Sequence, residues 1–424
     1  MHRMASSDET TITASSKTIV RSIIVFVVGL LVLFARKPDS LLNPQFWAED
    51  GRNWYADAYN LGSIAALFTT EAGYYQTISR LVAAASLWFP LEYAPLVFNA
   101  SAILIQVGVA MFIVSERCKP ILEDIKARYL MALTYLLLPN SWEVFANLTN
   151  SQWHLALLVC LMIVAAEPAT RLGRGFYLGV TALAAVSGPF CLLLLPIACV
   201  QTYLVRSRHK ATIAVILALG CLVQAYGLLT TTREVQSALG ASFDLFFQIV
   251  GRHIVLGPLV GVRGFARLQS WGLWGSVAAE IATISGLAVA FYLFAKASAQ
   301  IRLIMLYAAM ICVTALAWPA VTLEPGQWAV IANNPTALRY WFVPGFAFCL
   351  SLIYLLFKQE TKVARYVSAS LMLVCLYGVI KDFRIDPLKD LEFRSRAAEF
   401  ENAPSGTVVT IPINPDWKME LIKR

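Results

Sequence analysis

The chain has 424 residues, of which 58% are hydrophobic and 14% charged, and it carries a formal net charge of +8 at pH 7. Soluble globular domains contain roughly 45–50% apolar residues, so this composition excludes a soluble protein and favours a polytopic membrane protein. Basic loops on one side of a membrane account for the positive charge, which therefore gives no reason to expect nucleic acid as a partner.

The chain begins with a polar segment rich in Ser and Thr, residues 1–18, which we predict to be a disordered tail. The first apolar run covers about Ile19 to Ala35, close to the length of about 20 residues that crosses a bilayer. Lys17 and Arg21 flank its start. The positive-inside rule therefore places the N-terminus in the cytoplasm.

An acidic pair follows the first span, in Phe46-Trp47-Ala48-Glu49-Asp50-Gly51. Acids are scarce in this chain, and two carboxylates beside aromatic residues, where a lipid head group would lie, suggest a general base. We assign Asp50 as the base and Glu49 as the second candidate. The alternative is that both acids cap an interfacial helix, which we predict in the long outer loop from Arg36 to about Tyr75.

The predicted transmembrane domain covers residues 19–380. Its further spans lie near 95–115, 129–145, 152–166, 175–187, 188–205, 211–230, 277–296, 302–320, 341–357 and 364–380. The segment Gln76 to Pro90, which contains the substrate-binding candidate Arg80, is apolar but short. The count is therefore eleven or twelve spans. Basic clusters mark the cytoplasmic turns, which places residues 36–94, 140–152, 231–276 and 321–340 outside.

The second motif is dense in polar residues and joins two apolar runs, from Pro139 to His154. Such side chains are costly in lipid and must face a cavity or water. We take Asn147, Asn150, Trp153 and His154 as substrate-binding candidates. The alternatives are an anchoring role in the aromatic belt for Trp153 and a local hydrogen bond for His154.

Cations mark two later outer segments. The 231–276 loop contains Arg252 and His253, on the side where an anion would bind. Arg339 and Tyr340 begin a late apolar run, and we predict that Arg339 holds a phosphate through charge-assisted hydrogen bonds. Tyr340 is a further substrate-binding candidate, with an anchoring role in the aromatic belt as the alternative.

The last segment, residues 381–424, is predicted to be a short non-cytoplasmic tail. Residues 407–413 favour a strand, and the tail is too small for a stable domain of its own, so it should pack on the outer loops. No cysteine lies in a predicted outer loop, so we expect no disulfide framework. No Cys or His spacing suggests a metal site.

A cytoplasmic N-terminus, one span and an outer loop that opens with an acidic pair resemble the GT-C glycosyltransferases, which use polyprenyl-phosphate sugars. That family has an Asp-Glu-type motif followed by an aromatic residue, whereas here Glu49-Asp50 is followed by Trp54 and Tyr55. The order of the acids is reversed, which leaves open which one is the base. Arg339-Tyr340 also resembles members of the superfamily. The chain is similar to bacterial membrane proteins that carry both Phe-Trp-Ala-Glu-Asp-Gly and Asn-Leu-Thr-Asn-x-Gln-Trp-His.

The resemblance implies an all-α, GT-C-like protein of the bacterial inner membrane with its active site and C-terminus outside. It implies transfer of a sugar, with inversion, from a polyprenyl-phosphate donor to a hydroxyl of a glycan or lipid acceptor. No cofactor beyond this lipid-linked donor is expected. The alternatives are a flippase or transporter of lipid-linked sugars, and an O-antigen-type polymerase or ligase. Polar motifs on one face, with spans that are nearly free of charge at their centres, favour an enzyme over a transporter.

Overall fold

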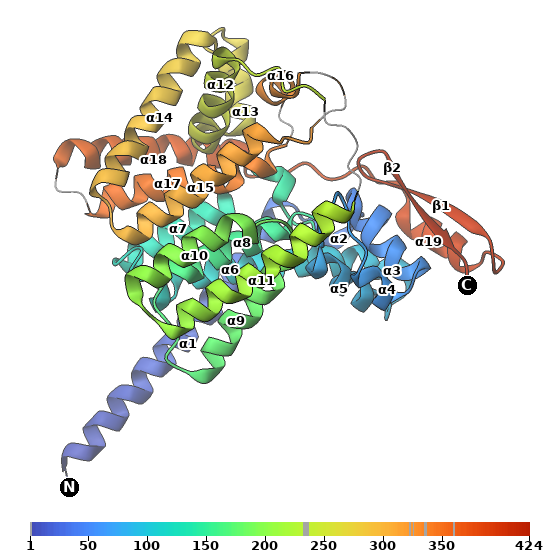
Figure 1. Cartoon of the computed structure of the whole chain (residues 1–424), viewed down its shortest axis with the longest axis horizontal. Coiled ribbons are helices and arrows are strands. Elements are labelled where there is room, and N and C mark those ends of the chain that lie inside the picture. Colours follow the sequence, from blue (N-terminus) through green and yellow to red (C-terminus); the bar gives the residue numbers. More distant parts are fainter. Residues whose placement is uncertain (1, 232–236, 322–323, 325, 335–336, 359–360) are drawn as a thin grey trace.

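The computed structural model describes residues 2–231, 237–321, 324, 326–334, 337–358 and 361–424, with only the backbone for residues 2–18. Helices form a bundle, and a β-hairpin lies at its edge (Figure 1). Among the described residues, eight helical segments are long and apolar enough to cross a membrane, which supports the predicted helical polytopic class. The unbroken ones belong to α1 (His2–Arg36), α6 (Ala94–Val114), α11 (Arg208–Thr230), α14 (Ser276–Lys296), α15 (Ala299–Ala317), α17 (Arg339–Lys358) and α18 (Lys362–Asp382).

Helix α1 starts earlier than the sequence suggested. Its backbone is helical from His2, whereas disorder was expected over residues 1–18, and Met1 lies outside the described residues. Its apolar, membrane-length part is Ile19–Arg36, close to the predicted first span.

Four predicted spans are shorter than expected. They are α7 (Ile125–Leu137), α8 (Ser151–Val164), α9 (Arg171–Ala185) and α10 (Cys191–Val205). Helices of 13–15 residues reach about 20–22 Å, less than the roughly 30 Å of a hydrocarbon core. Every residue of α8 is buried, so this helix meets other helices instead of lipid. The uncertain segment from Gln76 to Pro90 forms only α5 (Thr77–Ser86), which is too short to span.

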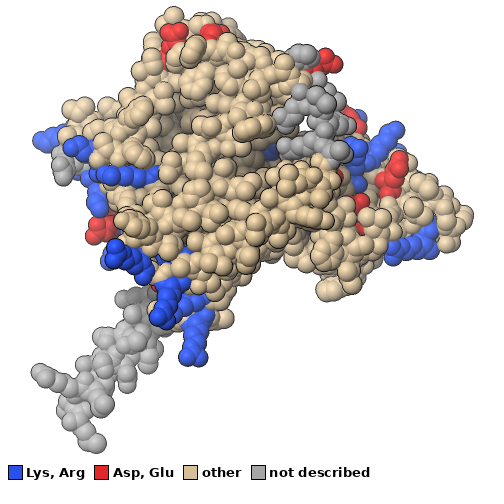
Figure 2. Space-filling view, viewed as in Figure 1, with Lys and Arg blue, Asp and Glu red and all other residues tan. Residues whose placement is uncertain are grey.

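Side-chain contacts show which helix termini share an end of the bundle. At one end, the Glu116 end, Arg21 of α1 pairs with Glu116 after α6 at 2.9 Å. At the other end, the Arg36 end, Arg36 donates to the carbonyl of Leu136 at 2.7 Å and to that of Phe383 at 3.3 Å. The ends of α1, α7 and α18 therefore lie together, as strict alternation of the spans predicts. Charged side chains are sparse across the middle of the face in Figure 2.

The predicted outer loop 231–276 is largely helical, so the expectation of a loop is wrong for its described part. Helix α12 (Phe243–Val250), the π-helical turn η5 (Gly251–Leu256) and α13 (Gly257–Ser270) form an apolar stretch. Residues 232–236 lie outside the described residues. The stretch breaks at Gly261, whose φ is 73° and where a Cβ would overlap the Asp382 carboxylate.

The chain enters and leaves this helical segment at the same end of the bundle. Thr231, after α11, contacts Thr70 of the first outer loop at 3.0 Å. Ala320, after α15, donates its N–H to the hydroxyl of Tyr340 at 3.2 Å. Only two residues join α14 to α15, so α14 starts near the end where α15 finishes. The helical segment thus leaves the alternation of the later spans unchanged.

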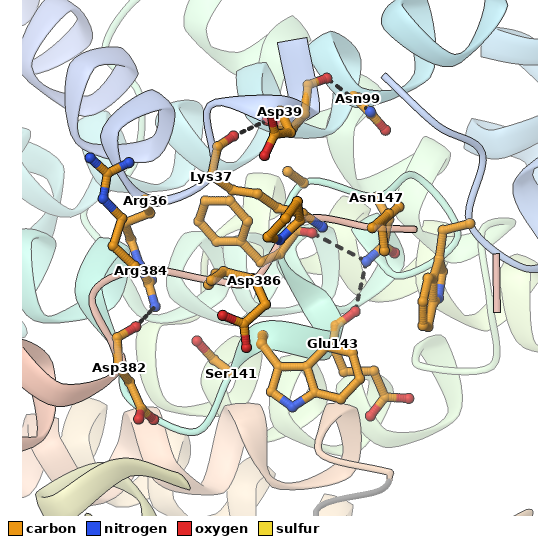
Figure 3. A pocket seen from close by; sticks show the side chains of 18 of the residues that line it. Arg36, Lys37, Asp39, Asn99, Ser141, Glu143, Asn147, Asp382, Arg384 and Asp386 are labelled. Atoms are coloured by element: carbon orange, nitrogen blue, oxygen red, sulfur yellow. Dashed lines mark hydrogen bonds between the residues drawn. The ribbon is translucent and has the colours of Figure 1, made fainter. Parts of the chain in front are cut away.

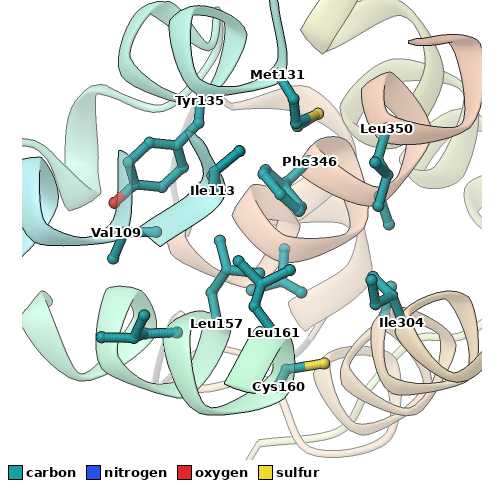
Figure 4. Packing of buried hydrophobic residues seen from close by; sticks show 14 of the residues in the cluster. Val109, Ile113, Met131, Tyr135, Leu157, Cys160, Leu161, Ile304, Phe346 and Leu350 are labelled. Carbon is teal, nitrogen blue, oxygen red and sulfur yellow. The ribbon is translucent and has the colours of Figure 1, made fainter. Parts of the chain in front are cut away.

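The main core lies where α17 crosses α7, α8 and α15. Buried side chains interdigitate there, among them Met131, Leu157, Leu161, Ile304 and Phe346 (Figure 4). In a membrane, close packing holds such helices together, because lipid tails are as apolar as the side chains. The buried face of α17 fixes the position of Arg339 at its first turn.

A second core covers the Arg36 end. It joins the loop after α1 to α6 and the C-terminal tail through Phe46, Trp54, Phe98 and Phe393. The tail forms α19 (Phe393–Glu401) and a hairpin of β1 (Val408–Ile413) and β2 (Trp417–Ile422), which confirms the predicted strand, and the tail packs on the loop after α1. The remaining elements are α2 (Asp39–Leu42), η1 (Asp50–Tyr55), α3 (Ala56–Asn60), α4 (Ser63–Leu67), η2 (Leu91–Tyr93), η3 (Glu116–Cys118), η4 (Trp142–Val144) and α16 (Gln327–Asn333).

Candidate functional site

The polar motif between α7 and α8 builds a tight turn at the Arg36 end. The side-chain amide of Asn147 donates to the carbonyl of Glu143 at 2.7 Å, and that of Asn150 donates to the same oxygen at 2.9 Å. The side-chain Oδ1 of Asn147 accepts the backbone N–H of Asn150 at 3.0 Å. Both side chains are buried. The two asparagines predicted to bind substrate therefore hold the turn in shape.

Asp50 is anchored to this turn. Its carboxyl oxygens accept the backbone N–H groups of Leu148 at 3.1 Å and Thr149 at 2.8 Å, and only 1% of the residue is exposed. Burial raises the pKa of Asp50 well above its usual range, the charge of Glu49 adds to the increase, and the two N–H groups oppose it. The residue that the sequence favoured as base has its oxygens engaged and out of solvent.

Glu49 is the more accessible acid of the pair. Its Oε2 lies 3.4 Å from the Thr149 hydroxyl, which also accepts the indole N–H of Trp54 at 3.2 Å. Glu49 is half-buried, whereas Asp50 is fully buried. Of the two acids, Glu49 is the one whose carboxylate can take a proton from an entering molecule.

The charge of Glu49 raises the pKa of two residues in the loop after α1. The pKa of Glu71 is raised by burial and then by Glu49, and Asn53 donates to Glu71 at 2.7 Å. Burial, Tyr340 and Glu49 raise the pKa of Tyr74 to about 12, while Arg339 and a hydrogen bond with Gln152 lower it. Glu49, Glu71 and Tyr74, which we call the Glu49 cluster, therefore lie close to the start of α17.

Arg339 is paired with Glu143, an acid that was not among the candidates predicted from the sequence. Its guanidinium Nη1 meets Glu143 Oε1, and its backbone N–H donates to Glu143 Oε2 at 3.1 Å. Nη2 donates to the carbonyl of Ala320 at 3.3 Å, and the guanidinium lies 4.8 Å from the ring centroid of Tyr340. Glu143 is the one acid of the polar motif. That scarcity was the available signal for a buried partner.

The two predicted histidines make local contacts. His154 Nδ1 lies 2.8 Å from the Tyr135 hydroxyl, and its Nε2 lies 2.9 Å from the carbonyl of Val144, so both ring nitrogens are engaged. His253 places Nε2 2.9 Å from the carbonyl of Ile331 and stacks on Trp341. The alternative of a local hydrogen bond therefore describes His154, and neither histidine reaches the Glu49 cluster.

The other cationic candidates are also used internally. Arg252 donates to the carbonyl of Ala332 and lies over Phe265. Arg80 pairs with Asp57 at 3.0 Å and lies over Trp54. Arg80 and Arg252 therefore bind different protein groups and share no contact.

Aromatic residues link the start of α17 to the second motif. Trp153 is 7% exposed and contacts Phe190 and Tyr340, with ring centroids 4.6 and 5.8 Å apart. The predicted candidates Trp153 and Tyr340 thus lie together, beside Arg339. Within the described residues, no group of three or more His, Cys, Asp or Glu side chains could hold a metal ion.

A cavity of about 420 Å³ opens next to the acidic pair, at the Arg36 end (Figure 3). Trp47 and Glu143 line it, whereas Glu49 and Asp50 do not. Its other lining residues come from α2, α6, α13, the end of α1, the turn before α8, and the end of α18 with the segment after it. They include Arg36, Lys37, Asp39, Trp142, Asp382 and Arg384. The acidic motif therefore borders the cavity through Trp47, with Glu49 two residues further along the chain.

Comparison with known proteins gives this chain no family. No protein-family model, curated protein or solved structure matches it.

Proposed function

We propose that the chain is a membrane-embedded glycosyltransferase that moves a sugar from a polyprenyl-phosphate donor to a hydroxyl of a glycan or lipid acceptor. The observation that carries the proposal is the Glu49 cluster, held at the end of a hydrophobic bundle where a lipid head group would lie. A half-buried carboxylate that solvent can still reach suits a general base in such a place. The GT-C resemblance of the sequence agrees with this chemistry.

In the proposed reaction, Glu49 is the base and Asp50 positions it. The acceptor hydroxyl loses its proton to the Glu49 carboxylate while its oxygen forms a bond to the anomeric carbon of the donor sugar. The bond from that carbon to the phosphate oxygen breaks, and the phosphate leaves with the electron pair. Attack from the face opposite the phosphate inverts the configuration. Asp50 holds the loop against the turn at Leu148 and Thr149, which fixes the position of Glu49.

The structure changes the role that we propose for Arg339. Because Glu143 already binds its backbone N–H and its guanidinium, capture of a phosphate would require Glu143 to be displaced. We therefore assign Arg339 as a positioning residue that orients Tyr340 and the second motif beside the Glu49 cluster.

The proposal includes the membrane in which the protein lies and its orientation there. The Arg36 end is placed outside a bacterial inner membrane, with the N-terminus and the Glu116 end in the cytoplasm, because basic residues flank the short turns at the Glu116 end. Because α5 is too short to span, the eleven-span alternative of the sequence layout remains part of the proposal, with the fully buried α8 inside the bundle.

A turnover assay tests the function. The purified protein in lipid nanodiscs is given a radiolabelled polyprenyl-phosphate hexose with soluble and lipid glycan acceptors, and labelled product is measured. Glu49→Gln should lower the rate by about 10²-fold or more. The matched control is Glu399→Gln, on the exposed face of α19. Full turnover by a folded Glu49→Gln protein would remove Glu49 from the reaction.

The same preparation separates the alternatives. A flippase or transporter would move a fluorescent lipid-linked sugar across sealed vesicles without releasing the polyprenyl phosphate. A polymerase or ligase would add repeat units or a whole glycan instead of single sugars. Movement without bond cleavage would replace our proposal with transport.

A further inference from the structure

Lys37 is a buried cation that faces the cavity at the Arg36 end. The residue is 9% exposed, lines the cavity and follows directly after α1 (Figure 3). Burial lowers the pKa of Lys37 to about 8, and the charge of Asp39 only partly opposes this. Among the described residues, none makes a hydrogen bond or ion pair with its ammonium group. A buried charge without a partner is costly, so this ammonium is a natural position for an anion.

Neighbouring cations in the lining are engaged, apart from Arg384, whose side chain is exposed. Arg36 donates to main-chain carbonyls at the ends of α7 and α18. Arg263 pairs with Asp386 at 2.7 Å. Asp382 accepts the N–H groups of Asn140 at 3.1 Å and Val262 at 2.7 Å. These contacts fix the shape of the cavity, and they leave Lys37 as the buried cation available to an entering molecule.

The walls of the cavity combine aromatic and amide side chains. Trp47 and Trp142 meet edge to face, with ring centroids 6.1 Å apart, and both line the cavity. Asn43 and Gln45 add amide groups from the loop after α2. Aromatic faces suit the C–H surface of a sugar, and amides suit its hydroxyls. The volume of about 420 Å³ falls in the range of roughly 300–1,000 Å³ that is usual for ligand sites.

We propose that this cavity binds an anionic saccharide, one that carries a carboxylate or a phosphate, and that Lys37 binds the anionic group. Because the cavity borders the acidic motif through Trp47, the bound saccharide is the acceptor of the transfer reaction. The identification of this saccharide as the acceptor rests on the proposed function. Binding of the saccharide does not require turnover.

Calorimetric titration of the full-length protein in nanodiscs at low salt tests the proposal. The probes are a disaccharide ending in glucuronic acid, its neutral methyl ester, glucose 1-phosphate and inorganic phosphate. The glucuronic disaccharide or glucose 1-phosphate should bind at least about tenfold more tightly than the methyl ester, as expected for a hydrogen bond to a charged group. Which of the two binds identifies the anionic group.

Variants of Lys37 supply the second arm. Lys37→Met should weaken binding of the anionic saccharide by about tenfold or more, whereas Lys389→Met, on the exposed surface of the same end, should leave it unchanged. Wild-type affinity should fall as the pH rises above about 8, because the ammonium loses its proton. Lys37→Arg should bind without that fall, since a guanidinium stays charged. Thermal unfolding establishes that each variant is folded.

Three results would overturn the proposal. They are equal binding of the acid and its methyl ester, unchanged binding by a folded Lys37→Met protein, and inorganic phosphate binding as tightly as glucose 1-phosphate. The last would mean that the cavity holds a plain anion instead of a saccharide. Glu49→Gln should bind the saccharide normally, so an inactive transfer reaction with intact binding would count against the proposed function alone.

Discussion

Removing the Asp50 carboxyl should loosen the turn before α8. In Asp50→Ala, the backbone N–H groups of Leu148 and Thr149 lose their acceptors inside the protein. Each hydrogen bond contributes about 0.5–1.5 kcal/mol, so the loss of both costs about 1–3 kcal/mol. One factor of ten corresponds to about 1.36 kcal/mol. Hydrogen exchange at these two amides should therefore accelerate about 5- to 150-fold.

Hydrogen exchange with mass spectrometry measures this directly in peptides that cover the turn. Asp50→Asn should give a smaller acceleration, because its carbonyl oxygen still accepts one of the two N–H groups. Glu49→Ala is the matched control, since Glu49 has only a 3.4 Å contact with the Thr149 hydroxyl and should change the exchange by less than about twofold. Wild-type exchange in Asp50→Ala would show that Asp50 does not hold the turn, and would leave it free to serve as the base.

Further predictions concern the Arg339 pair, the Glu49 cluster and the orientation. Arg339→Ala leaves the largely buried Glu143 without its cation and should lower the free energy of unfolding by about 2 kcal/mol. The double variant Arg339→Ala with Glu143→Gln should recover part of this loss. Equal losses in the single and double variants would show that the ion pair is not the cause. Glu71 has a raised pKa in the folded protein, so the stability it contributes is present below its unfolded pKa of about 4.3 and is lost as the pH rises through its folded pKa. Glu49→Gln should lower the folded pKa of Glu71, measured by NMR titration of labelled Glu. An unchanged pKa would show that the two carboxylates do not interact. Glu399→Cys, in a background without the native cysteines, should react with a membrane-impermeant thiol reagent from outside intact cells, and reaction only after lysis would reverse the proposed orientation.

Hydropathy and charge in the sequence determined the class of this protein and most of its layout. Apolar runs of membrane length predicted α1, α6, α11, α14, α15, α17 and α18, because a spanning helix needs local hydrophobicity that any chain must show in its own sequence. The strand at residues 408–413 was also visible, since its β-branched residues are followed by a turn. The acidic motif and the polar motif were identified as candidate functional segments because polar residues are costly beside lipid.

Tertiary structure alone decided what individual polar residues do. Arg339 and Glu143 are 196 residues apart, so no local pattern could pair them. Asp50 and Glu49 are neighbours with the same charge, and only the turn at Leu148 and Thr149 distinguishes the buried acid from the accessible one. The 231–276 segment was taken as an outer loop because basic clusters and the alternation of the spans placed it outside, yet it is largely helical, and Arg252 reaches a main-chain carbonyl that becomes its partner only in the folded protein. Burial and pairing depend on distant segments meeting in space, and for that physical reason composition and spacing could propose a candidate site but could not assign its residues.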